Sequence, residues 1–212
     1  MKTVIFANGT YSPNLYATMA IRQAECLIAA DNGARYCLDH GILPDVLIGD
    51  LDSLSPALLK EILLAETDII QYPEEKNMSD FELALEYAVT HQATDITILG
   101  GLGGRWDMSL SNIFLLTAPE LAHIKMVFIM EDHFLHVVHA NQRLCLNGQA
   151  GDLVSLLPLT PLALGITTEQ LRYPLYEEHL SFASSRGVSN RLTHKNGSVS
   201  LSAGVLLCAH YF

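Results

Sequence analysis

The chain has 212 residues, a length that allows one large domain or two small ones. Half of the residues are hydrophobic and 17% are charged, which excludes a disordered or fibrous chain. The formal net charge of −11 repels the phosphate backbone of nucleic acids, and no basic patch offsets it. We therefore expect no nucleic-acid partner.

The cysteines and the apolar runs bear on the cellular environment. Cys26, Cys37, Cys145 and Cys208 form no C-x-x-C pair, which favours reduced core thiols over a disulfide framework. No apolar run approaches the ~20 residues of a membrane span, and the run after Lys2 is shorter than a signal-peptide core. These patterns predict a cytoplasmic protein with no membrane partner.

The first two thirds of the chain alternate short apolar runs with helical patterns. Residues 58–65 and 81–91 carry apolar side chains at helical spacing, and Ser79 to Glu82 has the capping-box form S-x-x-E. This alternation is typical of a mostly parallel sheet with helices on both faces. Strands are expected at residues 3–7, 26–30, 46–48, 68–70, 95–99 and 125–130.

After about residue 132 the pattern changes to alternating apolar and polar residues between Asn-Gly and similar turns. This change predicts a second, all-β part of the chain. Its strands are expected at residues 134–138, 143–146, 153–157, 180–183, 198–202 and 205–210. We place the boundary so that residues 1–132 form an α/β domain and residues 133–212 a smaller all-β domain.

Two carboxylates follow a buried strand that ends at Gly49. Ligands of open α/β sheets bind at the carboxyl ends of the strands. If the chain stays extended there, Asp50 and Asp52 lie on one face and can approach a hard cation such as Mg²⁺. The alternative is an Asx-type turn with helix capping by Ser53 or Ser55, and a D-x-D pattern alone favours that alternative.

Further charged residues follow the neighbouring strands. Asp80 falls in the first turn of a predicted helix, where it either contacts a metal or compensates the helix dipole. Lys76 either meets a phosphate or is solvated. Asp31 closes the second strand at the same edge of the sheet, so we expect it to converge with the other strand-end acids on one site for a metal and a polyanion.

Residues 100–107 read GGLGGRWD and lie between a predicted strand and a predicted helix. Glycines at such a junction let backbone N–H groups approach phosphate oxygens, and Arg105 adds further donors. Phosphate binding is therefore favoured over a plain turn. The segment is neither a G-x-G-x-x-G dinucleotide fingerprint nor a Walker P-loop.

Taken in order, these motifs resemble those of thiamine pyrophosphokinases. The likeness rests on ADNGA at 30–34, PD at 44–45, IGDLDS at 48–53, KNMSD at 76–80 and GGRWD at 103–107. It continues at LRYPL in 171–175, GVSN in 187–190 and GSVS in 197–200. The resemblance implies a Rossmann-like α/β domain that binds ATP and Mg²⁺, a β-sandwich that binds thiamine, and a homodimer with thiamine sites between subunits.

The resemblance also implies roles for the residues at matching positions. The metal-organising, catalytic acids are Asp50, Asp52 and Asp80, and Asp107 is a further acid near the acceptor. ATP is contacted by Asp31, Gly33, Lys76, Gly103, Gly104 and Arg105. Thiamine is contacted by Asp107, Ser189 and Asn190.

Two positions depart from the usual pattern of the family. Asn77 stands where the family has Asp, and Met108 where it has His or Gln. Asn77 can offer an oxygen to Mg²⁺ but no charge, so Asn77→Asp is expected to lower the Mg²⁺ requirement. Three functions stay open: a thiamine pyrophosphokinase, a nucleotide or thiamine binder of the same fold that has lost catalysis, and a Mg²⁺-dependent phosphohydrolase with Asp50 as nucleophile.

Overall fold

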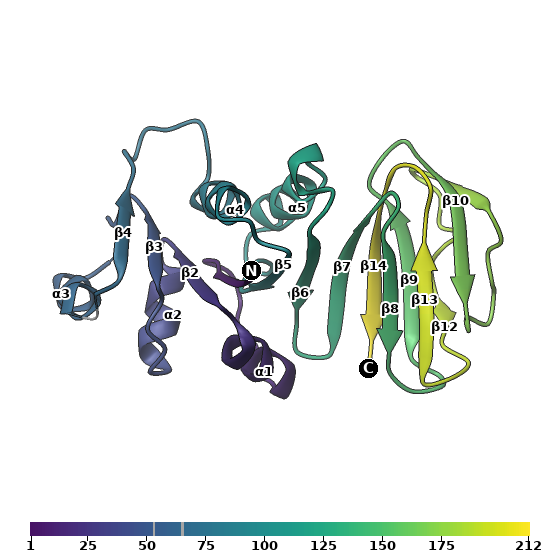
Figure 1. The fold of residues 1–212 in the computed structure, drawn as a ribbon, viewed down its shortest axis with the longest axis horizontal. Helices are drawn as coiled ribbons and strands as arrows, with labels where there is room; N and C mark the ends of the chain where they lie inside the picture. Colours follow the sequence, from purple (N-terminus) through teal and green to yellow (C-terminus); the bar gives the residue numbers. More distant parts are fainter. Residues whose placement is uncertain (53, 65) are drawn as a thin grey trace. The chain divides into compact units, whose positions relative to one another are not determined.

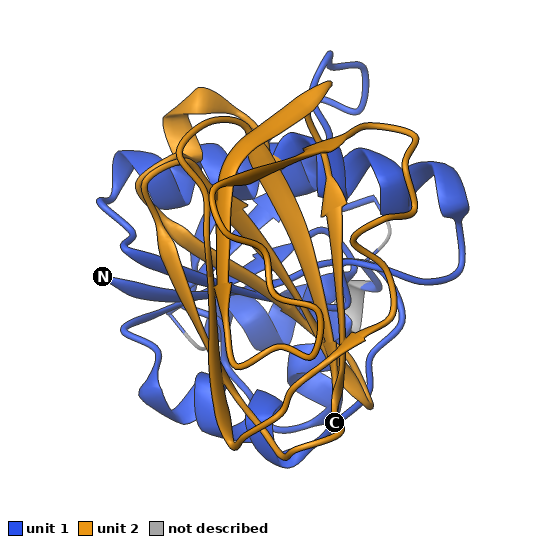
Figure 2. Ribbon diagram, turned by 90° about the vertical axis from the view of Figure 1, so that its right-hand side faces the viewer, with its two compact units in different colours: residues 1–115 blue, residues 116–212 orange. Residues whose placement is uncertain are grey.

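The protein is described by a computed structural model that covers residues 1–52, 54–64 and 66–212. The chain forms two compact units, Met1–Leu115 and Leu116–Phe212. The helices α1 to α5 all belong to the first unit, whereas the second consists of strands and loops with one 3-10 turn, η1 at Pro119–Leu121 (Figure 2). The expected domain boundary at residues 132 and 133 lies further along the chain than this division and stays a prediction.

The first unit contains a parallel sheet in which the neighbouring strands follow the order β5-β1-β2-β3-β4. β1 pairs with β2 on one side and with β5 on the other, both in parallel. The strands are short apolar runs in which most residues of β1, β2, β3 and β5 are buried, as expected for a parallel sheet covered on both faces, whereas β4 at the edge is partly exposed. Their bounds are β1 Lys2–Phe6, β2 Cys26–Ala30, β3 Val46–Gly49, β4 Asp68–Gln71 and β5 Asp95–Leu99.

The helices α1 to α4 connect these strands and α5 follows β5, with α4 and α5 on one side of the sheet and α1 and α2 on the other (Figure 1). Ser79 caps α4, because its Oγ accepts the N–H of Glu82 at 3.1 Å. The end of the expected helix at residue 65 lies outside the described residues, as does the capping proposed for Ser53. The helices are α1 Leu15–Gln23, α2 Gly33–Asp39, α3 Pro56–Leu64, α4 Asp80–Thr90 and α5 Trp106–Leu115.

The second unit contains strands in two neighbour orders, β12-β9-β14-β7-β6 and β11-β10-β13-β8. The strand pairs within it are antiparallel, and one buried apolar cluster draws on strands of both sheets, including Val138, Leu156, Ile166 and Val199. This is the expected β-sandwich. The strands are β6 Lys125–Ile129, β7 His133–His139, β8 Arg143–Asn147, β9 Leu153–Pro158, β10 Leu162–Glu169, β11 Glu178–Ser181, β12 Asn190–Arg191, β13 Asn196–Ser200 and β14 Val205–Tyr211.

The structure differs from the expected elements in some places. The strand expected at residues 125–130 is present as β6, and it pairs antiparallel with β7 within the second unit, while its place in the expected first domain stays a prediction. The strands β10 and β12 were not predicted, and neither were the helices α1 and α2. Cys145 is exposed, whereas the other three cysteines are buried thiols as expected.

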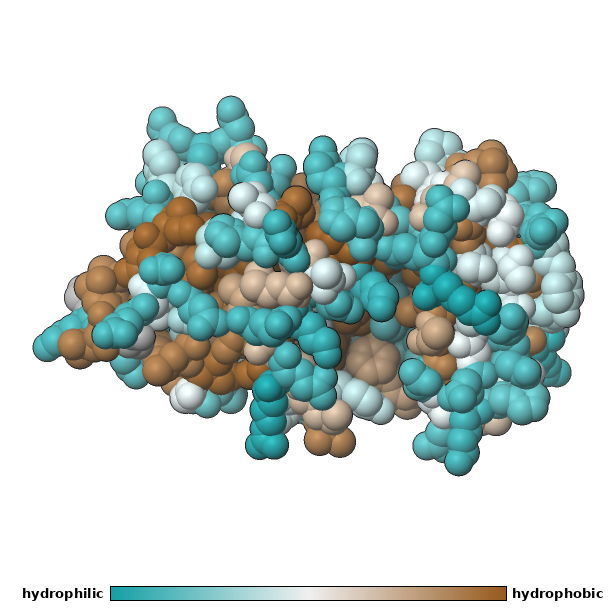
Figure 3. All heavy atoms as spheres, in the orientation of Figure 1, coloured by the Kyte–Doolittle hydropathy of each residue, from teal (hydrophilic) through white to brown (hydrophobic). Residues whose placement is uncertain are grey.

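The surface carries scattered apolar side chains. Figure 3 shows them gathered at the end of the view where α3 and β4 lie, and Leu63 and Leu64 of α3 are among the exposed large hydrophobic residues. Among the described residues, the helices are all too short or too polar to cross a bilayer.

Candidate active site

A cavity of about 640 Å³ lies in the first unit, at the carboxyl ends of its parallel strands. β1 is the strand at which the order reverses, because β2 follows it on one side and β5 lies on the other. Ligands of open α/β sheets bind at such a switch point. The cavity is lined by Ala7, Asn8, Gly9, Thr10, Ala30, Asp31, Asp50, Glu74, Lys76, Met78, Ser79, Asp80, Phe81, Gly100, Gly101, Gly103, Gly104, Arg105, Met108, Ser109 and Asn112.

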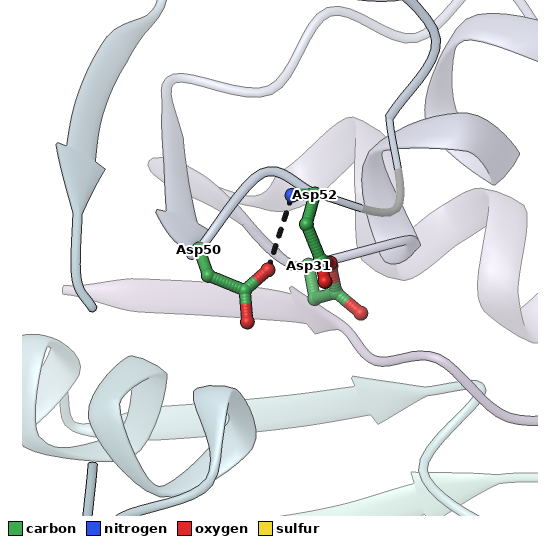
Figure 4. Close-up of side chains that lie close together, drawn as sticks. All are labelled: Asp31, Asp50 and Asp52. Carbon is green, nitrogen blue, oxygen red and sulfur yellow. Dashed lines mark hydrogen bonds between the residues drawn. The ribbon is translucent and has the colours of Figure 1, made fainter. Parts of the chain in front are cut away.

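Three carboxylates converge beside this cavity (Figure 4). Asp31 follows β2, and Asp50 and Asp52 follow β3; one carboxylate oxygen of each lies within 4.8 Å of the others. Neighbouring parallel strands bring their ends to one edge of the sheet, and β2 and β3 pair directly. The predicted convergence of these three acids is therefore present in the fold.

The Asx-type turn that the sequence left open as an alternative is present at Asp50 and Asp52, and a metal role for these two carboxylates stays a prediction. The backbone N–H of Asp52 donates to Oδ1 of Asp50 at 3.1 Å, which is an Asx-type turn, and Leu51 between them has a φ of +69°. The hydrogen bond from Asp52 lowers the pKa of Asp50, whereas contact with the Asp50 carboxylate and its charge raises the pKa of Asp52. The turn thus holds two carboxylates close enough to repel each other.

Lys76 and Asp80 extend this cluster from the segment that enters α4. The Lys76 ammonium lies 3.1 Å from Oδ1 of Asp80 and 3.6 Å from Oδ2 of Asp50. Burial raises the pKa of Asp80, and the nearby Lys76 offsets part of that shift. Partial burial lowers the pKa of Lys76, but its contacts with Asp80 and Asp50 outweigh burial, so the net shift is upward.

The donor set suits a hard divalent cation. Mg²⁺ takes oxygen ligands, and the strand ends present carboxylates. Although Oδ1 of Asp80 forms an ion pair with Lys76, it is a buried oxygen to which no described residue donates a hydrogen bond of good geometry. Lys76 supplies one positive charge against the four carboxylates Asp31, Asp50, Asp52 and Asp80, so this cluster keeps an excess of negative charge that fits a divalent cation.

The glycine-rich loop after β5 lines the opposite wall of the cavity. A side chain at Gly103 would collide with Thr10, since a Cβ there would lie 2.4 Å from Oγ1 of Thr10. The N–H of Gly103 donates to Oγ of Ser109 at 3.0 Å, which braces the loop against α5. Gly104 has a φ of +69° and faces open space, so its backbone is the part of the loop that a phosphate can approach most closely.

Arg105 and Asp107 form an exposed ion pair beside this loop. Nε of Arg105 donates to Oδ1 of Asp107 at 3.1 Å, and Nη2 contacts the other carboxylate oxygen. The Arg105 hydrogen bond lowers the pKa of Asp107. Arg105 lines the cavity, whereas Asp107 does not, so the structure presents Asp107 as a partner of the arginine.

Besides Asp52, which lies in the carboxylate cluster, two further predicted ATP or metal residues are absent from the cavity lining. Gly33 begins α2 beneath the end of β1, where an added Cβ would lie 2.1 Å from the carbonyl oxygen of Phe6; close packing accounts for a glycine at this position. Asn77 is exposed. The roles of Gly33 in ATP binding and of Asn77 in metal binding stay predictions.

The predicted thiamine residues Ser189 and Asn190 lie in the second unit. Asn190 is buried, and its side chain serves the backbone of Tyr173: Oδ1 accepts the Tyr173 N–H at 3.0 Å, and Nδ2 donates to the Tyr173 carbonyl at 2.7 Å. Ser189 is exposed, with a φ of +65°, and its N–H donates to Oγ of Ser155 at 3.0 Å. Asn190 therefore holds the segment around Tyr173 in place.

The loop after β1 was not predicted as part of the site. Asn8 donates to Oδ2 of Asp31 at 3.3 Å, and the N–H groups of Gly9 and Thr10 donate to the carbonyls of Gly100 and Leu102 at 2.6 and 2.9 Å. The signal was the Asn-Gly pair directly after the first buried strand. Its importance depends on knowing that β1 lies beside β5, which the sequence pattern does not reveal.

The sequence matches two family models in succession. The thiamin pyrophosphokinase catalytic domain matches residues 17–128, and the thiamin pyrophosphokinase vitamin B1 binding domain matches residues 134–206. A thiamine pyrophosphokinase of Bacillus subtilis (strain 168) is 30% identical over 180 residues, which span 85% of this chain and 84% of that relative.

Solved structures agree with these matches. The crystal structure of thiamine pyrophosphokinase from Bacillus subtilis has a TM-score of 0.82 at 26% identity and covers 99% of both chains. The crystal structure of thiamin pyrophosphokinase from Geobacillus thermodenitrificans has a TM-score of 0.82 at 27% identity and covers 100% of this chain and 98% of its own. Because the catalytic-domain model alone spans more than half of the sequence, the chain belongs to the thiamin pyrophosphokinase family.

Proposed function

We propose that this protein is a thiamine pyrophosphokinase, which transfers the pyrophosphoryl group of ATP to the hydroxyl group of thiamine and yields thiamine diphosphate and AMP. The observation that carries the proposal is the cavity of the first unit, where the carboxylates Asp31 and Asp50 lie across from a glycine-rich loop with Arg105, in a chain of this family. Carboxylates for a cation and backbone donors for phosphates are the two parts that phosphoryl-group transfer requires.

In the proposed reaction the hydroxyl oxygen of thiamine attacks the β-phosphorus of ATP. The bond between the β-phosphorus and the oxygen that bridges to the α-phosphorus breaks, that oxygen leaves with AMP, and the hydroxyl proton is released. Asp31, Asp50 and Asp52 at the strand ends, and Asp80 at the start of α4, would hold a Mg²⁺ ion, which when bound would neutralise charge on the phosphate oxygens.

The chain's own cationic and backbone groups position ATP. The N–H of Gly104 and the guanidinium of Arg105 bind the phosphates at the wall of the cavity opposite the carboxylates. For Arg105 to do so, its guanidinium turns from Asp107 to the phosphate, and Asp107 is then available to the acceptor hydroxyl. Arg105 and Asp107 are both well exposed, so this exchange requires no repacking.

We further propose that the protein acts as a homodimer, in which Ser189 and Asn190 help to form a thiamine site shared between subunits. The vitamin B1 binding match over residues 134–206 supports the location of this site in the second unit. In this proposal Asn190 does not contact thiamine itself but fixes the position of Tyr173, because its side chain hydrogen-bonds both the N–H and the carbonyl of the Tyr173 backbone.

The test is an assay of the purified chain with ATP, MgCl₂ and thiamine, followed by chromatography of the nucleotides and thiamine species. We expect AMP and thiamine diphosphate to appear in equal amounts, and neither to appear without Mg²⁺. Binding of ATP and thiamine with no product would favour a binder of the same fold. Release of inorganic phosphate without thiamine would favour a phosphohydrolase.

A further inference from the structure

Lys76 lies on the segment between β4 and α4, and its ammonium is surrounded by three oxygens. Nζ donates to the carbonyl of Pro73 at 3.2 Å and lies 3.1 Å from Oδ1 of Asp80 and 3.6 Å from Oδ2 of Asp50. The side chain of Lys76 is 14% exposed. An ammonium has three N–H donors and no acceptor, so three oxygens match what it can bind.

Two of these oxygens belong to carboxylates that we assign to the divalent cation. Oδ1 of Asp50 already accepts the N–H of Asp52, so Oδ2, which faces Lys76, is the oxygen with the greater remaining capacity to bind a cation. Oδ1 of Asp80 forms an ion pair with Lys76 and receives no hydrogen bond of good geometry from the described residues. A lysine ammonium and a divalent cation cannot both be close to these oxygens without repelling each other.

We propose that Lys76 is an internal counter-cation that neutralises Asp50 and Asp80 in the metal-free protein, is displaced when the divalent cation binds, and then moves to the polyphosphate in the same cavity. This inference rests on the proposed function. Lys76 lines the cavity, so its flexible stem can redirect the ammonium without leaving the site. When the metal takes the place of the Lys76 ammonium at the carboxylates, the ammonium becomes available to bind the phosphates.

The proposal predicts opposite effects on two ligands. If the metal must displace the Lys76 ammonium from the carboxylates, the ammonium weakens metal binding. Because linkage is reciprocal, the metal weakens the contacts of the ammonium with the carboxylates by the same factor. Removing the ammonium should therefore tighten binding of the metal alone and weaken binding of ATP. A lysine that only orders the carboxylates would give the reverse for the metal, because its loss would disorder the ligands.

The experiment measures Mn²⁺ binding by isothermal titration calorimetry without nucleotide, and the KM for ATP at saturating Mg²⁺. The variants are Lys76→Gln, Lys76→Arg, which keeps the positive charge, and Lys60→Gln, which removes an exposed lysine from α3. We expect Lys76→Gln to bind Mn²⁺ at least about fivefold more tightly, with a higher KM for ATP, and the other two variants to bind Mn²⁺ like the wild type. Unchanged or weaker Mn²⁺ binding by Lys76→Gln would overturn the inference.

A second measurement uses the wild-type protein and does not depend on how any variant folds. Acetic anhydride labels accessible lysines, and mass spectrometry measures the extent at each position. We expect Mn²⁺ to increase labelling of Lys76 and to leave Lys60 unchanged; equal or reduced labelling of Lys76 would overturn the inference. The inference about Lys76 and the proposed function can fail separately. If the protein does not bind Mn²⁺, or if its Mn²⁺ affinity does not depend on Lys76, the inference is rejected, and product formation is still measured independently. If the Lys76 effects are observed but no thiamine diphosphate forms, the proposed function alone is rejected.

Discussion

The Asp50 carboxylate contacts the backbone with one oxygen and the charged cluster with the other. Oδ1 accepts the N–H of Asp52, and Oδ2 faces Lys76. An asparagine at this position can still accept the N–H through its amide oxygen, but it has no charge for a cation. The substitution Asp50→Asn therefore keeps the turn, which is the alternative explanation for this residue, and removes the charge that metal binding needs.

We predict that Asp50→Asn lowers thiamine diphosphate formation by about a hundredfold or more while the melting temperature stays close to that of the wild type. Turnover and thermal melts of the same preparation check this. Asp39→Asn is the control, because Asp39 is an exposed acid on α2 that forms an ion pair with Arg35. Near-full activity of Asp50→Asn would show that the charge at this position is dispensable.

The raised pKa values of Asp80 and Asp52 predict that the stability of the metal-free protein and its stabilisation by a metal both depend on pH. A carboxyl group whose pKa is higher in the folded than in the unfolded protein costs stability when ionised, and this cost disappears as the pH falls through the folded pKa. The metal-free protein should therefore gain stability from these two groups on mild acidification. Asp50, whose pKa is lowered, is protonated last.

Stabilisation by Mg²⁺ should change with pH in the opposite direction, because protons compete with the cation for the same oxygens. We predict that the rise in melting temperature caused by MgCl₂ shrinks as the pH falls from about 7 toward about 4, and that it does so at a higher pH than ordinary aspartates would give, because the pKa values of Asp80 and Asp52 are raised. Scanning calorimetry with and without MgCl₂ measures it, with Asp39→Asn as a control that should follow the wild type. A rise of constant size across this range would contradict the assignment.

At the scale of elements, the glycine-rich loop and the end of α2 offer a matched pair of positions. Gly104 and Gly41 have φ values of +69° and +65°, and an added Cβ meets no atom within 4 Å at either position. An alanine at either glycine should therefore cost a similar amount of stability, about 1 to 2 kcal/mol, from the left-handed backbone alone. Gly104 lines the cavity and Gly41 does not.

We predict that Gly104→Ala raises the KM for ATP, because the added methyl group and the altered backbone hinder approach of a phosphate, and that Gly41→Ala leaves the KM unchanged. Denaturant unfolding establishes that the two variants lose comparable stability, and steady-state kinetics compares their KM values. Equal KM values for both variants and the wild type would remove Gly104 from the phosphate site.

Sequence patterns predicted elements well where burial alone decides them. The strands from β1 to β5 are short apolar runs, and each lies within a residue or two of its expected position. α1 and α2 were not predicted: α1 follows a polar loop and begins at an Asn14 cap, and α2 starts directly at Gly33 in a segment that reads as a turn. Tertiary contacts decide such helices, since local preference is weak over so few residues.

β10 shows why the alternation of apolar and polar residues did not predict every strand of the second unit. Its buried residues Ala163 and Ile166 are three apart, because the register with β11 shifts between them, and Gly165 there has a φ of +61°. An irregularity of this kind breaks the period of two by which a half-buried strand is identified. β12 is only two residues long, too short for any pattern.

Candidate site residues were predictable where strand ends carry charge, as at Asp31, Asp50 and Asp52. The loop from Asn8 to Thr10 was not, because it contributes backbone and amide groups whose position depends on β1 lying next to β5. The contact of Arg105 with Asp107 was also not foreseen, although the two residues are close in sequence.

At the scale of the whole molecule, a thiamine site shared between subunits predicts complementation. Asp50→Asn inactivates the first unit, and Asn190→Ala removes the side chain that holds Tyr173 in the second. If the two variants are unfolded and refolded together, random pairing should restore about a quarter of the wild-type activity. Light scattering on the same samples reports the oligomeric state.

The control mixes Asp50→Asn with Asp52→Asn. Both changes lie in the first unit, so no pairing of these chains creates an intact site, and activity should stay low. A strict monomer that makes product, or complementation no greater than in this control, would contradict the shared site.

Isotope-labelled ATP tests the proposed reaction most directly, because it follows which phosphorus atoms move to thiamine. The purified chain is incubated with thiamine, MgCl₂ and ATP labelled at the α-, β- or γ-phosphorus in separate reactions, and the products are separated. We predict that β- and γ-label both appear in thiamine diphosphate and α-label in AMP, and that Asp50→Asn lowers this transfer by about a hundredfold or more. Transfer of γ-label alone with release of ADP, or label in inorganic phosphate without thiamine, would contradict it.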